Sequence, residues 1–106
     1  MDLIVAKTIL EQLGGSKFIA MTGAKDLVGQ ADSLMFKLPK KPGFVKQGIN
    51  FVKIILMPDD TYKMEFSKIS LKRYVKMHWE IKRIDDVYCD QLQELFTEVT
   101  GLDTHL

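Results

Sequence analysis

Hydrophobic and polar residues alternate along several short stretches of the chain, which is the pattern of β-strands that bury one face. The clearest stretch is 75–82, where apolar residues occupy every second position. Residues 33–38 and 62–67 repeat this period, whereas 49–57 is apolar on both parities, as in a central strand. The composition of the short segment 17–22, which has aromatic and β-branched residues, also predicts a strand. The pattern therefore predicts about five strands.

The two ends of the chain carry apolar residues at helical spacing instead. A first helix is predicted over 2–13, capped by Asp2 and ended by the glycines at 14 and 15. A second helix is predicted to begin near 85–86, where two acidic residues favour the positive helix end, and to stop at Gly101. Its expected apolar stripe consists of Tyr88, Leu92, Leu95, Phe96 and Val99.

Short connections separate the predicted strands. They are a glycine-containing loop at 23–32, a proline-rich break at 39–43 and a turn at 58–60. Connections of this length favour antiparallel pairing between strands that are neighbours in sequence. The sequence predicts an α+β fold, a two-layer single domain over residues 1–106. Its sheet is mainly antiparallel, with about five strands and the N- and C-terminal helices on one face.

The total charge hides an uneven distribution. The chain of 106 residues has 15 basic and 14 acidic residues, for a formal net charge of +1. Residues 37–83 hold twelve basic and four acidic residues, whereas residues 84–106 hold six acidic residues and no lysine or arginine. The near-neutral total therefore does not exclude a charged partner.

Strand parity predicts that many of these cations share the uncovered sheet face, and two loops add others. Such a surface favours contact with phosphates, and hence with nucleic acid. The alternative is a solvated sheet face whose lysines discourage edge-to-edge aggregation. The candidate residues for binding nucleic acid or another partner are Lys37, Lys40, Lys41, Lys63, Lys72, Arg73, Lys76, His78 and Lys82.

No combination of residues in the sequence predicts catalysis. A glycine-rich phosphate loop is missing, and His78 lies far from His105 in sequence. Trp79 and the single cysteine, Cys89, are interpreted as core residues. Nothing combines a nucleophile, a base and oxyanion donors. The sequence predicts a protein that is not an enzyme and that uses no cofactor or metal.

The composition also predicts a setting for the protein. Apolar runs such as 54–57 are too short to cross a membrane, and the start of the chain lacks the features of a signal peptide. A lone cysteine fits a reducing compartment. A cytoplasmic protein without membrane contact is expected, and its oligomeric state is left open.

Four stretches of the chain resemble a family of short uncharacterised proteins encoded by bacteriophages, prophages and other bacterial mobile elements. They are ILEQLGGSKFIAMTGAK at 9–25, SLMFKLP at 33–39, MPDDTYKMEFSKI at 57–69 and DDVYCDQLQELFTEVTGLDTHL at 85–106. The resemblance implies a bacterial cytoplasmic setting and a viral or mobile-element context. It carries over no catalytic or binding residue.

Two functions are suggested by these observations as hypotheses. The first is a small non-enzymatic protein that binds a host or phage macromolecule and modulates host machinery or defence. The second is a nucleic-acid-binding protein that uses the cationic sheet face. Steep salt dependence of binding would distinguish the second from the first.

Overall fold

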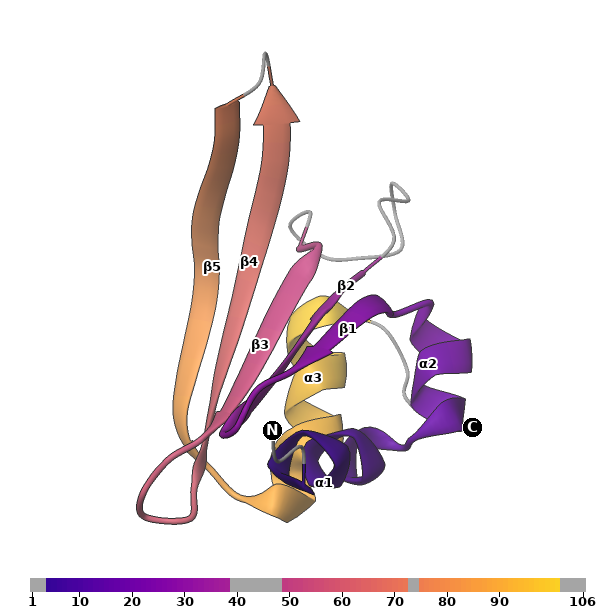
Figure 1. Ribbon diagram of the computed structural model, residues 1–106, viewed down its shortest axis with the longest axis vertical. Coiled ribbons are helices and arrows are strands. Elements are labelled where there is room, and N and C mark those ends of the chain that lie inside the picture. The colour runs from indigo at the N-terminus through magenta and orange to yellow at the C-terminus, as the bar shows by residue number, and fades with distance from the viewer. Residues whose placement is uncertain (1–3, 39–48, 73–74, 102–106) are drawn as a thin grey trace.

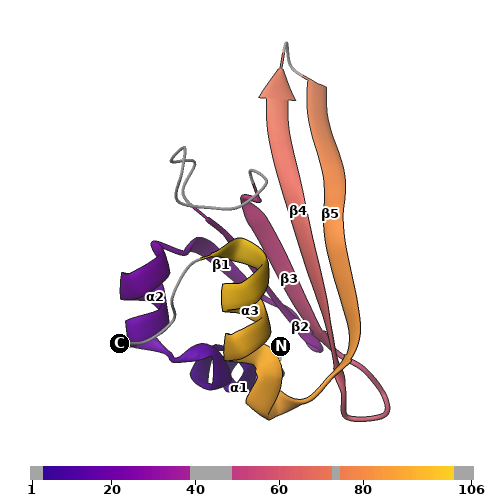
Figure 2. The same ribbon diagram turned by 180° about the vertical axis from the view of Figure 1, so that it is seen from behind.

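A five-stranded antiparallel sheet carries three α-helices on one of its faces (Figures 1 and 2). The computed structural model describes residues 4–38, 49–72 and 75–101, with the backbone alone for 70–72 and 75–77. The strands lie in the order β1-β2-β3-β4-β5, so each one pairs with its neighbour in sequence. The elements are α1 (Ile4–Leu13), α2 (Ser16–Thr22), β1 (Lys25–Gly29), β2 (Ser33–Lys37), β3 (Phe51–Leu56), β4 (Tyr62–Lys72), β5 (Val75–Val87), the 3-10 helix η2 (Cys89–Gln91) and α3 (Leu92–Thr100). The predicted α+β architecture is confirmed.

Helix α1 forms as its sequence pattern predicts from Ile4 to Leu13, whereas the predicted cap Asp2 lies outside the described residues. Ala6, Ile9 and Leu13 lie three and four residues apart, so they share one side of the helix, and all three are buried. The helix ends at Leu13 because Gly14 and Gly15 adopt φ angles of 124° and 61°, which glycine tolerates best. The helix therefore covers the sheet with its apolar side only.

The segment 17–22, predicted as a strand, is instead the helix α2. Phe18 and Thr22 lie one turn apart on its buried side, and the Thr22 hydroxyl donates to the Phe18 carbonyl at 2.7 Å. Gly23 ends the helix in the left-handed conformation, with its N–H donating to the Ile19 carbonyl at 2.9 Å. A run of six residues is too short for periodicity to separate helix from strand. Complete burial of Phe18 in the core stabilises the helix.

The segment 23–32, predicted as a loop, contains the edge strand β1. Val28 pairs with Met35 and Gly29 with Leu34 of β2. The strand is short and mostly exposed, so its sequence lacks the alternation that marks a half-buried strand. Its backbone hydrogen bonds to β2 hold it in the sheet.

Four fully buried phenylalanines form the centre of the core. They come from α2, β2, β4 and α3, so they join both helical ends of the chain to the sheet. The Phe96 ring lies 5.2 Å from Phe18, 6.1 Å from Phe36 and 6.4 Å from Phe66, measured between ring centroids. The sheet face that bears Phe36 and Phe66 is called the inner face below, and the opposite face the outer face.

The C-terminal helix begins later than predicted. Strand β5 continues through Asp85 and Asp86 to Val87, and α3 begins at Leu92. The two acidic residues therefore do not cap the helix. Asp86 adopts a φ of 56° at an irregularity in the pairing of β5 with β4, and the strand continues past it to Val87. Gly101 ends α3 in the left-handed conformation, as predicted.

The apolar stripe of α3 is confirmed in part. Leu92 and Phe96 are buried, and the structure packs the two other helical members of the stripe against the core. Tyr88 precedes the helix and is 60% exposed. Cys89, predicted as a core residue, is exposed because it lies in η2 and not on the buried side of α3.

Candidate nucleic-acid interface

Strands β4 and β5 extend past the rest of the sheet as a two-stranded ribbon (Figure 1). The pairing of β3 with β4 ends at Phe51 opposite Ser67, whereas β4 and β5 stay paired as far as Lys72 opposite Val75. Residues 68–72 and 75–79 are called the arm below. In both views the arm lies beyond the layer of helices, so it presents two faces that these helices do not cover (Figures 1 and 2).

Asn50 secures the base of the arm. Its side-chain amide donates to the Ile69 carbonyl at 2.8 Å, and its side-chain oxygen accepts the Ile69 N–H at 2.7 Å. The Asn50 backbone N–H donates to the Ser67 carbonyl at 3.0 Å. The Asn50 side chain thus replaces the backbone of a further β3 residue before Phe51. It satisfies the backbone hydrogen bonds of Ile69 at the edge of β4 that β3 does not reach.

Replacing Asn50 by alanine is expected to lower the free energy of unfolding by about 2 kcal/mol, because the Ile69 N–H and carbonyl lose their partners. Hydrogen exchange at the Ile69 amide should accelerate at the same time. Urea unfolding and amide exchange measure the two effects. The control variant Thr8→Ala removes only a local bond to the Ile4 carbonyl and should change stability by about 0.5 kcal/mol or less. Unchanged protection of Ile69 in Asn50→Ala would contradict the role given to this side chain.

Two irregularities in β5 change which residues face which side. Phe66 pairs with Lys82 but Ser67 pairs with Glu80, so β5 has one extra residue, Ile81, between these pairs. A second extra residue lies between the pairs Met64 with Ile84 and Tyr62 with Val87. Because side chains alternate along a strand, each extra residue reverses the parity of the residues that come after it in β5.

Lys82, predicted on the uncovered face, therefore lies on the inner face with Phe66, because directly paired residues share a face. Lys37, Lys63 and His78 do lie on the outer face, where Lys37 pairs with Phe51 and His78 with Ile69. Of the other predicted residues, Lys40, Lys41 and Arg73 lie outside the described residues. Lys72 and Lys76 belong to β4 and β5, in the part described by its backbone alone.

The outer face pairs opposite charges and is not uniformly cationic. Lys53, Glu65 and Arg83 lie side by side on three adjacent strands. Arg83 Nε also approaches Asp85 Oδ2 at 3.8 Å, and Lys37 Nζ lies 3.7 Å from Asp26 Oδ2. Exposed pairs of this kind stabilise the fold little, but they reduce the positive potential that a phosphate would meet.

One aromatic contact lies on the outer face beside the arm. The rings of Phe51 and His78 meet edge to face, with centroids 6.2 Å apart. Phe51 is half-buried there and pairs with Ser67, which is buried. This contact covers the outer side of the arm base, so little of the Phe51 ring surface is accessible to a ligand.

Among the residues whose side chains the structure describes, three on the inner face of the arm and its base are exposed to solvent: Lys68, Trp79 and Lys82, called the Trp79 patch below. Lys68 pairs directly with Trp79, and Lys82 pairs with Phe66, two residues along β4 from Lys68. The extra residue Ile81 lies between Trp79 and Lys82 and packs against the core. Trp79, predicted as a core residue, is 43% exposed because the helices do not reach this far along the ribbon. Glu80, the nearest acid in sequence, pairs with Ser67 on the outer face. Among the described residues of β4 and β5, no acidic side chain shares the inner face with the patch.

The sequence around the patch is strongly basic. Residues 68–83 contain six lysines and arginines but only one acid, Glu80. Of these cations, Lys68 and Lys82 have described, exposed side chains on the inner face, on a ribbon that extends past the layer containing the acidic C-terminal helix (Figure 1). Positive charge at such a position is suited to contact phosphates.

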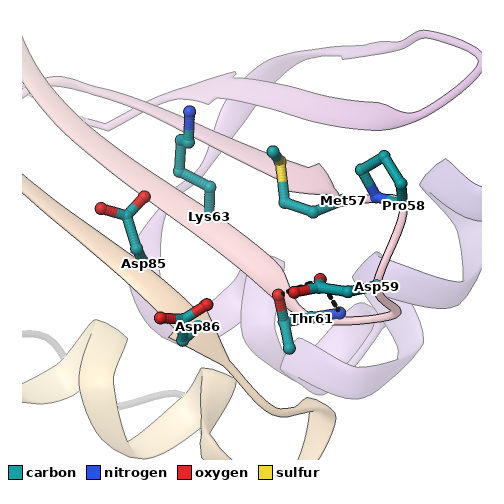
Figure 3. Close-up of a pocket in the computed structure, with 7 residues that line it drawn as sticks. All are labelled: Met57, Pro58, Asp59, Thr61, Lys63, Asp85 and Asp86. Carbon is teal, nitrogen blue, oxygen red and sulfur yellow. Dashed lines mark hydrogen bonds between the residues drawn. The ribbon is translucent and has the colours of Figure 1, made fainter.

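A shallow hollow of about 540 Å³ lies at the opposite end of the ribbon (Figure 3). It is lined by the turn at Pro58 and Asp59 and by Lys63, Asp85 and Asp86 of the adjacent strands. Asp59 Oδ1 accepts the Thr61 hydroxyl at 2.6 Å and the Thr61 N–H at 3.1 Å.

These two hydrogen bonds, that of the hydroxyl first, hold the pKa of the Asp59 carboxyl below its usual value. The carboxylate therefore remains ionised at neutral pH and serves to close the turn. Asp60 beside it adopts a φ of 68°, a left-handed position that completes the connection between β3 and β4. The acids of this turn thus have structural roles.

Neither a metal site nor a membrane-spanning helix is found where the structure describes the chain. No group of three or more His, Cys, Asp or Glu side chains in the described residues is placed to hold a metal ion. None of the described helices has the length and apolar character needed to cross a bilayer.

Comparison with known proteins adds no relative: no family model matches the chain, and no curated protein or solved structure matches it either.

Sequence analysis missed two members of the Trp79 patch as binding residues. The sequence does contain a signal for Lys68. Every second residue of β4 from Tyr62 to Phe66 is apolar and buried, and Lys68 is the next residue on that face. No local signal in the sequence shows where the covering helices end, so the alternation of β5 alone predicts a buried Trp79. The parity of Lys82 depends on a bulge that periodicity does not reveal.

Proposed function

We propose that this protein is a non-enzymatic nucleic-acid-binding protein that contacts the phosphate backbone through the inner face of its β4–β5 arm. The observation that carries the proposal is the Trp79 patch, where Lys68 lies across from an exposed indole and Lys82 lies further along the same strand. The described residues of β4 and β5 place no acid on this face. Lysine ammonium groups bind phosphates as point charges and release the counterions that phosphates condense.

The proposal moves the interface from the outer face, favoured by strand parity, to the inner face of the arm. On the outer face, Glu65, Glu80 and Asp85 accompany the cations, and a phosphate backbone would pass close to these carboxylates. On the inner face, the described residues of the ribbon offer positive charge and an aromatic surface together. Phosphate contacts of this kind position a nucleic acid without reading its sequence.

Salt-dependent binding tests the proposal. The protein is mixed with fluorescein-labelled 20-mers of single-stranded DNA, duplex DNA and RNA, and anisotropy is measured between 50 and 200 mM NaCl. With the two phosphate contacts of Lys68 and Lys82, affinity should fall roughly 10-fold across this range, because each contact adds about 0.7 to 0.9 to the salt slope. Absence of binding to all three probes at 50 mM NaCl would overturn the proposal.

Binding of a host or phage protein, together with the mobile-element setting that the sequence resemblance implies, stays a prediction. Affinity capture from a bacterial lysate, repeated after nuclease treatment, distinguishes it from the proposal above. A partner that is retained without nucleic acid would support a protein-binding role, and capture that depends on nucleic acid would favour the arm as the binding element.

A further inference from the structure

We infer that the Trp79 patch binds single-stranded nucleic acid, with the indole stacked on an unpaired base and Lys68 and Lys82 on the neighbouring phosphates. This inference rests on the proposed function and adds the form of nucleic acid that the arm selects. It is drawn from the combination of one exposed aromatic residue and two cations on the same face of a ribbon that the described helices do not cover.

The exposure of Trp79 has no explanation in the stability of the fold. Tryptophan is one of the most buried residues on average, and its exposure costs the burial of a large apolar surface. The described core is complete without it, because Phe66 closes the inner face against α3 and Trp79 lies beyond that contact. An exposed indole at the side of a basic ribbon matches the aromatic surfaces on which proteins stack unpaired bases.

The spacing of the two lysines fits a nucleotide at this position. Lys68 lies directly across from Trp79, and Lys82 lies opposite Phe66, which is two residues from Lys68 on β4 and so about 7 Å along the ribbon. A base that lies on the indole would therefore have Lys68 beside it on the neighbouring strand and Lys82 further along the ribbon. Flexible lysine side chains can track the backbone of a single strand, in which every nucleotide carries a phosphate on both sides.

A duplex does not offer the same contact. Its bases are stacked on one another and paired, so an indole reaches a base face only if a base is unstacked or flipped at a cost of a few kcal/mol. The stacking contribution of Trp79 is therefore available to single strands alone, whereas Lys68 and Lys82 contact the phosphates of either form. This difference predicts a preference for single strands that disappears when the indole is removed.

Trp79 is the only tryptophan of the chain, so its fluorescence reports the contact directly. Titration with a 20-mer of oligo(dT) should quench the emission along the same curve as the anisotropy of the labelled strand, and a 20-base-pair duplex should not quench it. The variant Trp79→Ala should bind the single strand about 10-fold more weakly or worse and the duplex within about twofold of wild type. Trp79→Phe retains an aromatic face and should lie within about threefold of wild type for the single strand.

Tyr88→Ala is the matched control, because Tyr88 is an exposed aromatic residue outside the Trp79 patch. It should leave both affinities unchanged, and circular dichroism checks that each variant folds. If Trp79→Ala does not fold, quenching in the wild type and the affinity of Trp79→Phe decide the question. Equal affinity for single strand and duplex, with no quenching, would overturn this inference and leave the proposed function standing. Absence of binding to either form would overturn the proposed function itself.

Discussion

Reversing the charge of the Trp79 patch in the double variant Lys68→Glu/Lys82→Glu is expected to weaken nucleic-acid binding about 100-fold at 50 mM NaCl. Both lysines are exposed on a face of β4 and β5 without a described acid, so the change replaces two phosphate contacts by two repulsions. The slope of log K against log salt should also become shallower by about two. Anisotropy titrations between 50 and 200 mM NaCl measure both effects.

The control variant Lys7→Glu/Lys17→Glu makes the same change in net charge at exposed positions of α1 and α2. Both double variants carry a formal charge of −3 instead of +1, so a nonspecific effect of net charge would weaken binding equally in the two. We expect the control to lose less than about fivefold. Equal losses in the two variants would show that the arm is not the interface.

Replacing Phe96 by alanine is expected to lower the free energy of unfolding by about 3 to 5 kcal/mol. Phe96 is fully buried, and its ring contacts those of Phe18, Phe36 and Phe66. Its removal leaves a cavity where α2, α3 and the sheet meet. Domains of this size have about 5 to 15 kcal/mol of stability in total, so the variant should melt roughly 15 to 30 °C below wild type.

Thermal and urea unfolding followed by circular dichroism measure this loss. The variant Phe96→Leu keeps most of the volume and should lose about 1.5 kcal/mol or less. Tyr88→Ala removes an exposed ring from the neighbouring segment and should change stability by about 0.5 kcal/mol or less. A loss below about 1 kcal/mol in Phe96→Ala would mean that the four-phenylalanine cluster does not hold the two layers together.

Segments with a sustained period were predictable from the sequence. The helix ending at Leu13 and the inner residues of β2, β3 and β4 lie where the apolar pattern places them. A buried face imposes its own period on the sequence, which is 3.6 residues in a helix and two in a strand. Short or irregular segments were not predictable. The helix α2 covers seven residues, and the strand β1 is mostly exposed, so neither contains enough periods to indicate its type.

The candidate interface also has features that the sequence predicts and features that it does not. The basic character of the middle of the chain is a property of the sequence, and the placement of His78 and Lys63 on one face is given by simple alternation. Simple alternation does not give the face on which Lys82 lies, because Ile81 becomes an extra residue only when β5 pairs with β4. A single inserted residue reverses the side chains that follow it as far as the second irregularity of β5, and its position depends on contacts with another strand.

The sequence by itself determined the helix α1, the central strands, the glycine stops and the concentration of positive charge between residues 37 and 83. These features arise from neighbours along the chain, so local pattern is sufficient to predict them. Only the tertiary structure decided that β4 and β5 extend past the helices, that Asn50 secures the base of the arm, and that Trp79 is exposed on the same face as Lys68 and Lys82. These outcomes depend on where β3 ends, how far α3 reaches and where β5 bulges, which are contacts between residues distant in sequence.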